Sequence, residues 1–158
     1  KSSAPIAMSN DCLYFMPKDS LVVYKYSIID KCLSRTAEIK SSTFKVKPFT
    51  QKSIDVNIMA SLSYLFNNSS NVSLSVSGNE ISILTIEGNA KVNPEMLLSN
   101  VNRYSCLYKY DIKSNITQKA SFGEKIKNDL VSSFNGSLYY VKNEIKDSSD
   151  VYSVWLLP

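Results

Sequence analysis

The sequence predicts a mainly β domain, built as an antiparallel sandwich or meander with one short helix near residues 93–101. Apolar and polar residues alternate with a period of two along most of the chain, which is the pattern of half-buried strands. Turn sequences interrupt this alternation, because Ser-Gly-Asn at 77–79 and Asn-Gly at 135–136 tolerate the positive φ of tight hairpins. The 158 residues are enough for one core, so we expect a single domain over 11–158 behind a flexible lead-in or tether at 1–10.

The alternation also defines the individual strands in chain order. It predicts strands at 12–16, 21–29, 43–47, 53–59, 62–66, 72–76, 81–86, 104–112, 116–122, 130–134, 138–141 and 151–156. The last segments are joined by short turns, so the C-terminal third is expected to be an antiparallel meander.

The start of the helix is justified by three consecutive residues. Asn93 can cap a helix, Pro94 stands at the first helical position where no N–H is needed, and Glu95 favours the positive end of the helix dipole. A second helix over 123–132 would compete with the strand at 130–134, and the sequence leaves both alternatives open.

Two similar sequence segments suggest an alternative architecture with an internal repeat. The segment 107–112 repeats the Tyr-Lys-Tyr pattern of 23–28 at a distance of 84 residues, which is twice the length of a propeller blade. A partial β-propeller-like repeat is therefore the alternative fold, although a closed propeller needs at least four blades and no third copy lies between the two segments.

Composition removes most enzyme classes. The chain contains no His, so it lacks the usual general base and every His-dependent nucleophile or zinc site. Its four Gly residues form no cluster that could bind a phosphate, so we expect no nucleotide cofactor and no other cofactor. Chemistry by carboxylates alone remains open, but the prediction is a protein that is not an enzyme.

The cysteines allow one internal disulfide at most. Of the three pairings among Cys12, Cys32 and Cys106, a Cys12–Cys32 bridge around the first hairpin is the preferred one. Three buried free thiols are an equally good interpretation, since free Cys behaves as a small apolar residue. No Cys-x-x-Cys motif occurs, so the cysteines do not predict a metal site.

The charged and aromatic residues indicate which kind of partner the protein binds and which residues could contact it. The net charge of +4 is spread along the chain and does not predict nucleic-acid binding. The alternation Tyr24-Lys25-Tyr26 is most simply a core face of tyrosines opposite a solvent face of lysine. Tyr139 and Tyr140 are neighbours on a strand and must point to opposite faces, so one of them is a candidate partner contact.

We expect the protein to be exported, to the periplasm or the cell surface. The polar segment at 1–10 is typical of the residues that follow a removed targeting signal or form a tether. No stretch approaches the roughly 18 apolar residues that span a bilayer, so contact with a membrane would depend on a lipid anchor upstream of Lys1.

The N-terminal hairpin carries a family resemblance. Asn-Asp-Cys-Leu-Tyr-Phe at 10–15, Asp-Ser-Leu at 19–21 and the segment 24–28 resemble the first hairpin of small periplasmic immunity-type lipoproteins of bacterial type VI secretion systems. The resemblance covers about a fifth of the chain, and it implies a membrane-tethered β-sandwich that neutralises a toxin by occluding its active site. The expected function is therefore non-catalytic binding of another protein; the alternative is a carbohydrate- or cell-surface-binding domain that uses exposed tyrosines.

Overall fold

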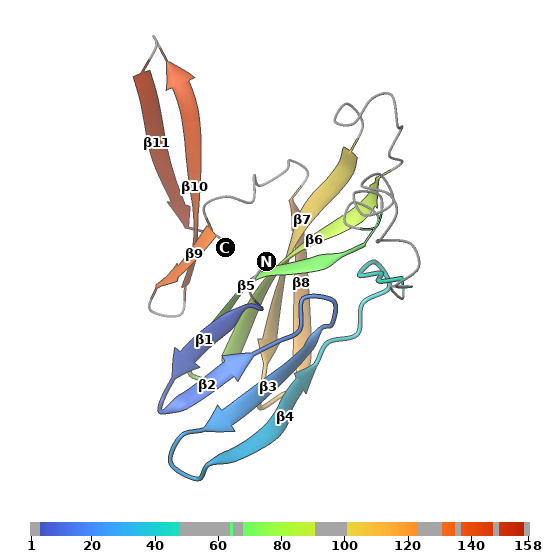
Figure 1. The fold of residues 1–158 in the computed structure, drawn as a ribbon, viewed down its shortest axis with the longest axis vertical. Coiled ribbons are helices and arrows are strands. Elements are labelled where there is room, and N and C mark those ends of the chain that lie inside the picture. The colour runs from blue at the N-terminus through green and yellow to red at the C-terminus, as the bar shows by residue number, and fades with distance from the viewer. Residues whose placement is uncertain are drawn as a thin grey trace, which may run out of the picture.

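The structure is a computed structural model that describes residues 4–47, 64, 68–90, 101–122, 131–134, 137–146 and 149–156. In chain order its strands are β1 (Ile6–Ser9), β2 (Cys12–Phe15), β3 (Val22–Ser27), β4 (Cys32–Glu38), β5 (Ser70–Ser77), β6 (Glu80–Ala90), β7 (Val101–Asp111), β8 (Ile116–Phe122), β9 (Val131–Phe134), β10 (Ser137–Lys146) and β11 (Ser149–Leu156). The mainly β fold predicted by the period-two alternation is confirmed (Figure 1).

The strands form three antiparallel sheets in which sequence neighbours pair. Sheet A has the order β1-β2-β3-β4, sheet B has the order β5-β6-β7-β8, and sheet C has the order β11-β10-β9. Short connections produce this meander, because a short turn returns the chain alongside the strand that it has just left, where the next strand pairs in the antiparallel direction. The β10–β11 hairpin of sheet C extends away from sheets A and B (Figure 1).

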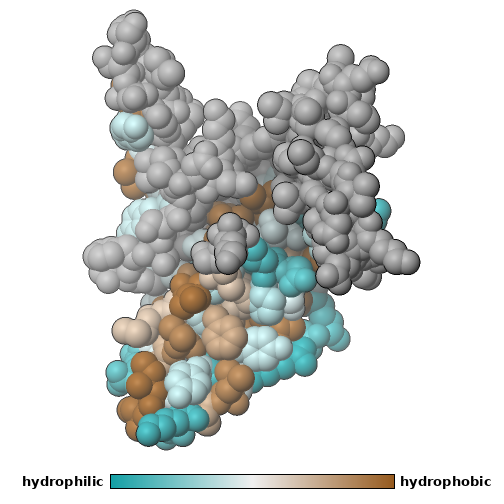
Figure 2. Space-filling view, in the orientation of Figure 1, coloured by the Kyte–Doolittle hydropathy of each residue, from teal (hydrophilic) through white to brown (hydrophobic). Residues whose placement is uncertain are grey.

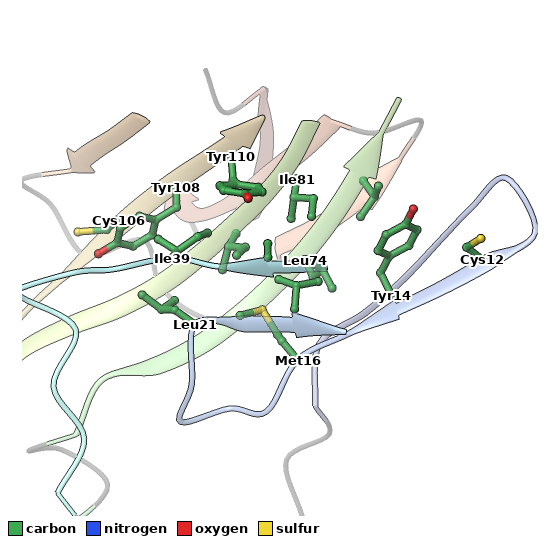
Figure 3. Close-up of a cluster of buried hydrophobic side chains, with 14 residues drawn as sticks. Cys12, Tyr14, Met16, Leu21, Ile39, Leu74, Ile81, Cys106, Tyr108 and Tyr110 are labelled. Carbon is green, nitrogen blue, oxygen red and sulfur yellow. The ribbon is translucent and has the colours of Figure 1, made fainter. Parts of the chain in front are cut away.

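Sheets A and B pack face to face around one core. Sheet A and the segment that follows it contribute Cys12, Tyr14, Met16, Leu21, Val23, Ala37 and Ile39, and sheet B contributes Leu74, Val76, Ile81, Ile83, Cys106, Tyr108 and Tyr110. These side chains come from alternate positions of their strands, so one face of each sheet builds the core (Figure 3). The sandwich predicted from the sequence is the architecture of these eight strands.

The two similar segments, 23–28 and 107–112, occupy equivalent places in this sandwich. They fall on β3 and β7, which are the third strands of the two four-stranded meanders. The sheets that contain them face each other across a single core instead of following one another around an axis as propeller blades do. The sequence similarity therefore corresponds to two similar meanders in a sandwich.

Two strands, β1 and β4, were not predicted from the sequence. Residues Ile6–Ser9, expected to belong to a polar lead-in, form β1 and pair with β2 across a two-residue turn. Asn10 and Asp11 form this turn with φ of 48° and 55°, values that Asn and Asp tolerate better than most residues. β4 (Cys32–Glu38) has consecutive polar residues and is exposed over half of its length, which hides the alternation.

The strand expected at 43–47 is wrong, because these residues have no regular structure. Their backbone donors are taken by side chains instead: Ser41 Oγ accepts a hydrogen bond from the Phe44 amide at 3.2 Å, and Ser69 Oγ accepts one from the Lys45 amide at 2.9 Å. Side-chain acceptors of this kind compete with strand pairing.

Several other predictions fall outside the described residues. These are the strand at 53–59, nearly all of the strand at 62–66, and residues 93–100 of the helix expected at 93–101, whereas Val101 begins β7. The alternative helix at 123–132 is likewise outside up to residue 130, and β9 follows from Val131. The Asn-Gly turn itself is not described, but β9 and β10 pair from Phe134 and Ser137 outward, as a tight hairpin requires.

The predicted Cys12–Cys32 disulfide is wrong, because all three cysteines are free thiols. Cys12 and Cys32 both pair with Ser27 of β3, one from each side. Two strand spacings amount to about 10 Å, beyond the ~7 Å between Cα atoms that a disulfide can bridge. Cys12 and Cys106 are buried, and Cys32 is exposed.

This distribution predicts how the thiols react with a thiol reagent such as DTNB. In the folded protein only Cys32 is expected to react rapidly, and in concentrated guanidinium all three thiols should be titrated without prior reduction. The variant Cys32→Ser is the control, and it should abolish the rapid phase. Fewer than three thiols in the unfolded chain would contradict the free-thiol assignment.

Candidate binding surface and a buried carboxylate

The outer face of sheet A carries two rows of side chains that run across all four strands. One row consists of Met8, Leu13, Tyr26 and Leu33, and the other of Ile6, Phe15, Tyr24 and Arg35. Residues paired across antiparallel strands point to the same face of a sheet. Their sequence neighbours in the core, such as Tyr14 and Val23, are buried, so both rows point away from the core.

Seven of these eight side chains are uncharged and largely apolar. We call them the apolar face: Ile6, Met8, Leu13, Phe15, Tyr24, Tyr26 and Leu33. At its two edges Met8 is 73% and Leu33 60% exposed. Near its centre the rings of Phe15 and Tyr24 stack with centroids 5.6 Å apart and an angle of 19° between their planes.

Apolar side chains are visible on the molecular surface over sheet A, with more polar ones between them (Figure 2). Figure 2 shows apolar side chains gathered beside paler ones in the lower half of the molecule, where Figure 1 places sheet A. A sheet that faces water usually alternates apolar residues on the inside with polar residues on the outside. Sheet A carries apolar side chains on both faces, and an exposed apolar patch is typical of a surface that a partner covers.

Arg35 ends the second row without giving the apolar face a net charge. Its guanidinium forms an ion pair with Glu38 on the same strand. Both side chains are about half exposed, so this pair contributes little to stability. What the sheet offers a partner is therefore contact area and not a charged group.

The expected orientation of Tyr24 and Tyr26 is wrong. Val23 and Ser27 of the same strand are buried toward sheet B, so the two tyrosines lie on the outer face, and the half-buried Lys25 lies on the inner face. The alternation itself is as predicted, and only the choice of buried face differs.

The predicted contacts Tyr139 and Tyr140 lie on β10 of the projecting hairpin. In the strand register, Tyr139 pairs with Leu156 of β11 and Tyr140 pairs with Trp155. Tyr139 is half-buried, and the side chain of Tyr140 is outside the described residues. β11 also exposes large side chains on both faces, among them Tyr152 and Trp155, each 60% exposed.

A different site lies inside the sandwich, where Glu87 of β6 is completely buried. Its Oε1 accepts hydrogen bonds from the hydroxyls of Thr85, at 3.1 Å, and Tyr108. Its Oε2 forms an ion pair with Lys119 Nζ of β8 at 3.0 Å. Cross-strand pairing of β6, β7 and β8 brings these groups onto one face of sheet B.

The segment after β4 completes this cluster. Ser41 Oγ lies 2.7 Å from the Tyr108 hydroxyl and 3.1 Å from Thr43 Oγ1, which in turn accepts a hydrogen bond from Lys119. Lys119 Nζ also lies 5.1 Å from the centroid of the Tyr108 ring, within reach of a cation–π interaction. The cluster therefore joins the chain leaving sheet A to three strands of sheet B.

The cluster stabilises both charges of its ion pair. Burial raises the pKa of Glu87, but hydrogen bonds from Thr43, Tyr108 and Lys119 and the charge of Lys119 outweigh it, so the pKa lies below its ordinary value of 4.5. Burial lowers the pKa of Lys119, yet the bonds to Tyr108 and Glu87 raise it above its ordinary value of 10.5. The Glu87 carboxylate is ionised at neutral pH, and both of its oxygens are engaged by Thr85, Tyr108 and Lys119. It is therefore not poised as a general acid or base.

Cys106 and Tyr108 are not activated nucleophiles either. Burial raises the pKa of the Cys106 thiol, whose Sγ lies 3.4 Å from Ser121 Oγ. Burial and the hydrogen bond to Glu87 raise the pKa of Tyr108. Both groups therefore stay protonated at neutral pH, and we assign the cluster a structural role.

Sequence reasoning missed this cluster, although part of it was visible. Period two places Glu87 on the same face of β6 as Ile81 and Ile83, which predicts a buried carboxylate. Its partner Lys119 lies on another strand, 32 residues away, and only the strand register brings the two together.

Comparison with known proteins adds no relative: no family model matches the chain, and no curated protein does so. Within the described ranges there is no group of three or more Cys, Asp or Glu side chains that could hold a metal ion. The same residues contain no helix long and apolar enough to cross a membrane.

The buried ion pair predicts how stability depends on pH. Because the folded pKa of Glu87 is lowered, its contribution is present above the unfolded value near 4.5 and is lost as pH falls through the folded pKa. Because the folded pKa of Lys119 is raised, its contribution is present below 10.5 and is lost as pH rises through the folded pKa. Chemical denaturation across pH should show both losses.

Glu87→Gln should lower the free energy of unfolding at pH 7 by about 3 kcal/mol, since it leaves a partly buried lysine without its charge partner. The matched control is Glu38→Gln, which breaks an exposed pair and should change stability by less than about 0.5 kcal/mol. Equal effects of the two variants would contradict the structural role assigned to Glu87.

Proposed function

We propose that this protein is a non-catalytic module that binds another protein through the apolar face of sheet A. The observation that carries the proposal is the pair of cross-strand rows, one of which has two ends, Met8 and Leu33, that are each more than half exposed. Complete burial of such a side chain is worth about 1.5 to 3 kcal/mol, so a partner that covers the face gains affinity from several of them. The stacked Phe15 and Tyr24 rings are held in place before binding, which lowers the entropic cost.

The mode of action that fits such a face is steric occlusion. A flat surface without charged or activated groups can cover a partner's active site but offers nothing for chemistry. The segment that resembles immunity-type lipoproteins, residues 10–28, supplies β2 and β3, and these strands carry the centre of the apolar face. The proposal therefore includes neutralisation of a toxin or enzyme by an exported protein, in the periplasm or at the cell surface.

A second candidate function rests on β11. The exposed rings of Tyr152 and Trp155 favour binding of a carbohydrate or a cell surface by stacking. The two residues are three positions apart on a strand and point to opposite faces, so they cannot form one platform. This geometry makes carbohydrate the second choice and protein the first.

The proposal is tested by mapping where a partner contacts the chain. A photo-cross-linking amino acid at Tyr26 should capture a defined protein in cells of the source organism, and the same group at Ile116 should not. Ile116 is a suitable control because it is 58% exposed. Its neighbour Thr117 pairs with the core residue Tyr110, so Ile116 lies on the face of sheet B that points away from sheet A.

Calorimetry with the captured protein then measures the contribution of the face. Tyr26→Ser should weaken binding at least tenfold, about 1.4 kcal/mol, whereas Ile116→Ser should leave the dissociation constant unchanged. Equal affinities for the two variants would exclude the apolar face as the binding site. A glycan whose binding is lost in Trp155→Ala would favour the second candidate instead.

A further inference from the structure

Sheet A has two edge strands, and they differ in what lies next to them. β1 lies close to β5 of sheet B, although the two strands are not paired. β4 is the last strand on the other side, and none of the strands in the described part of the chain pairs with its outer edge. Among the described strands, the outer edge of β4 is therefore unpaired and lies at the border of the sheet that carries the apolar face.

This edge is accessible over the first half of β4. Residues 32–35 are all exposed, although their side chains alternate between the two faces of the sheet. The β3–β4 turn lies at the far end of sheet A, where neighbouring elements are few (Figure 1), and Ile29 in this turn is 74% exposed. The backbone N–H and C=O groups on the outer side of an edge strand are unpaired, so they can accept a further strand.

The usual protections of an edge are weak in this stretch. β4 contains no proline, and its one basic residue, Arg35, is neutralised by Glu38. The register shift opposite Val23 and Tyr24 interrupts regular pairing only beyond Arg35, so residues 32–35 keep regular strand geometry. Proline, charged side chains and bulges are devices that natural edges use against strand addition.

The apolar face continues up to this edge. The row that begins at Met8 on β1 ends at Leu33 on β4, whose side chain is 60% exposed and has no cross-strand neighbour on its outer side among the strands that the structure describes. A strand added beside β4 would place one side chain next to Leu33 and, two residues along, another next to Arg35. An apolar side chain at the first position would extend the row.

We propose that β4 accepts an extended segment of the partner protein as a fifth strand of sheet A, with apolar side chains at alternate positions that continue the apolar face. This inference rests on the proposed function and specifies the element that is recognised. Main-chain hydrogen bonds provide affinity in such a complex, and alternate side chains provide selectivity. The net charge of +4 favours a neutral or acidic segment over a second copy of this chain.

The test uses the full chain and a synthetic nine-residue peptide in which valine and threonine alternate, with glutamate at both ends. Binding is measured by fluorescence anisotropy, and amide hydrogen exchange locates the protected strand. The expected result is binding with a dissociation constant below about 1 mM and slower exchange in β4. The same peptide methylated on one set of alternate backbone nitrogens should lose binding, and the other set should keep it.

Two protein variants separate strand addition from simple coverage of the face. Leu33→Glu and Met8→Glu place the same charge at the two ends of one row, at positions that are 60% and 73% exposed. Strand addition at β4 predicts that Leu33→Glu weakens peptide binding about tenfold while Met8→Glu changes it less than about twofold. Circular dichroism checks that both variants are folded, and the methylated peptides test the same point on the unaltered protein.

Several outcomes would overturn the inference. Absence of peptide binding, equal losses in the two variants, or protection of β1 without β4 would each exclude strand addition at this edge. Concentration-dependent self-association that disappears in Leu33→Glu would assign the edge to a second copy and also overturn it. None of these results touches the proposed function, which fails separately if Tyr26→Ser binds the captured partner as tightly as the unaltered protein.

Discussion

Packing of sheet A against sheet B determines how most of this molecule is arranged. Once Tyr14 and Val23 are buried in the core, the two-residue period of a strand directs Phe15 and Tyr24 to the opposite face. In most sandwiches that opposite face is polar, so core and solvent separate cleanly. Here both sets of side chains are apolar. Burial of one set in the core therefore leaves the other set as a second apolar surface exposed to water.

The interior of the sandwich changes character along its length. On the inner face of β6, Ile81 and Ile83 are followed by Thr85 and then by Glu87, so the core is apolar at one end and charged at the other. A buried ion pair adds little stability compared with well-packed apolar residues, but it tolerates few alternative arrangements. We therefore regard the Glu87 cluster as the feature that fixes the path of the chain after β4, whereas the apolar face is the surface that we propose for partner binding.

The sequence was sufficient for the fold class because strand periodicity and turn residues are local properties. It was not sufficient for the choice of face: Tyr24-Lys25-Tyr26 and Tyr108-Lys109-Tyr110 have the same pattern, yet the first pair of rings lies outside and the second inside. Periodicity determines which residues share a face, and only the packing of whole sheets decides which face is buried. For the same reason the apolar face was not predicted, since it depends on the register of four strands, one of which, β1, lies in the segment that was predicted to be a lead-in or tether.

The three free thiols have a consequence for how the protein is made. In an oxidising compartment an unfolded chain would expose Cys12, Cys32 and Cys106 together, and any pair of them could be oxidised before the sheets form. Folding removes two of them from this chemistry, and Cys106 is additionally kept as a poorly reactive thiol by its raised pKa. The order of events during biosynthesis, folding first and exposure to oxidant second, would then decide what fraction of the protein reaches its native form.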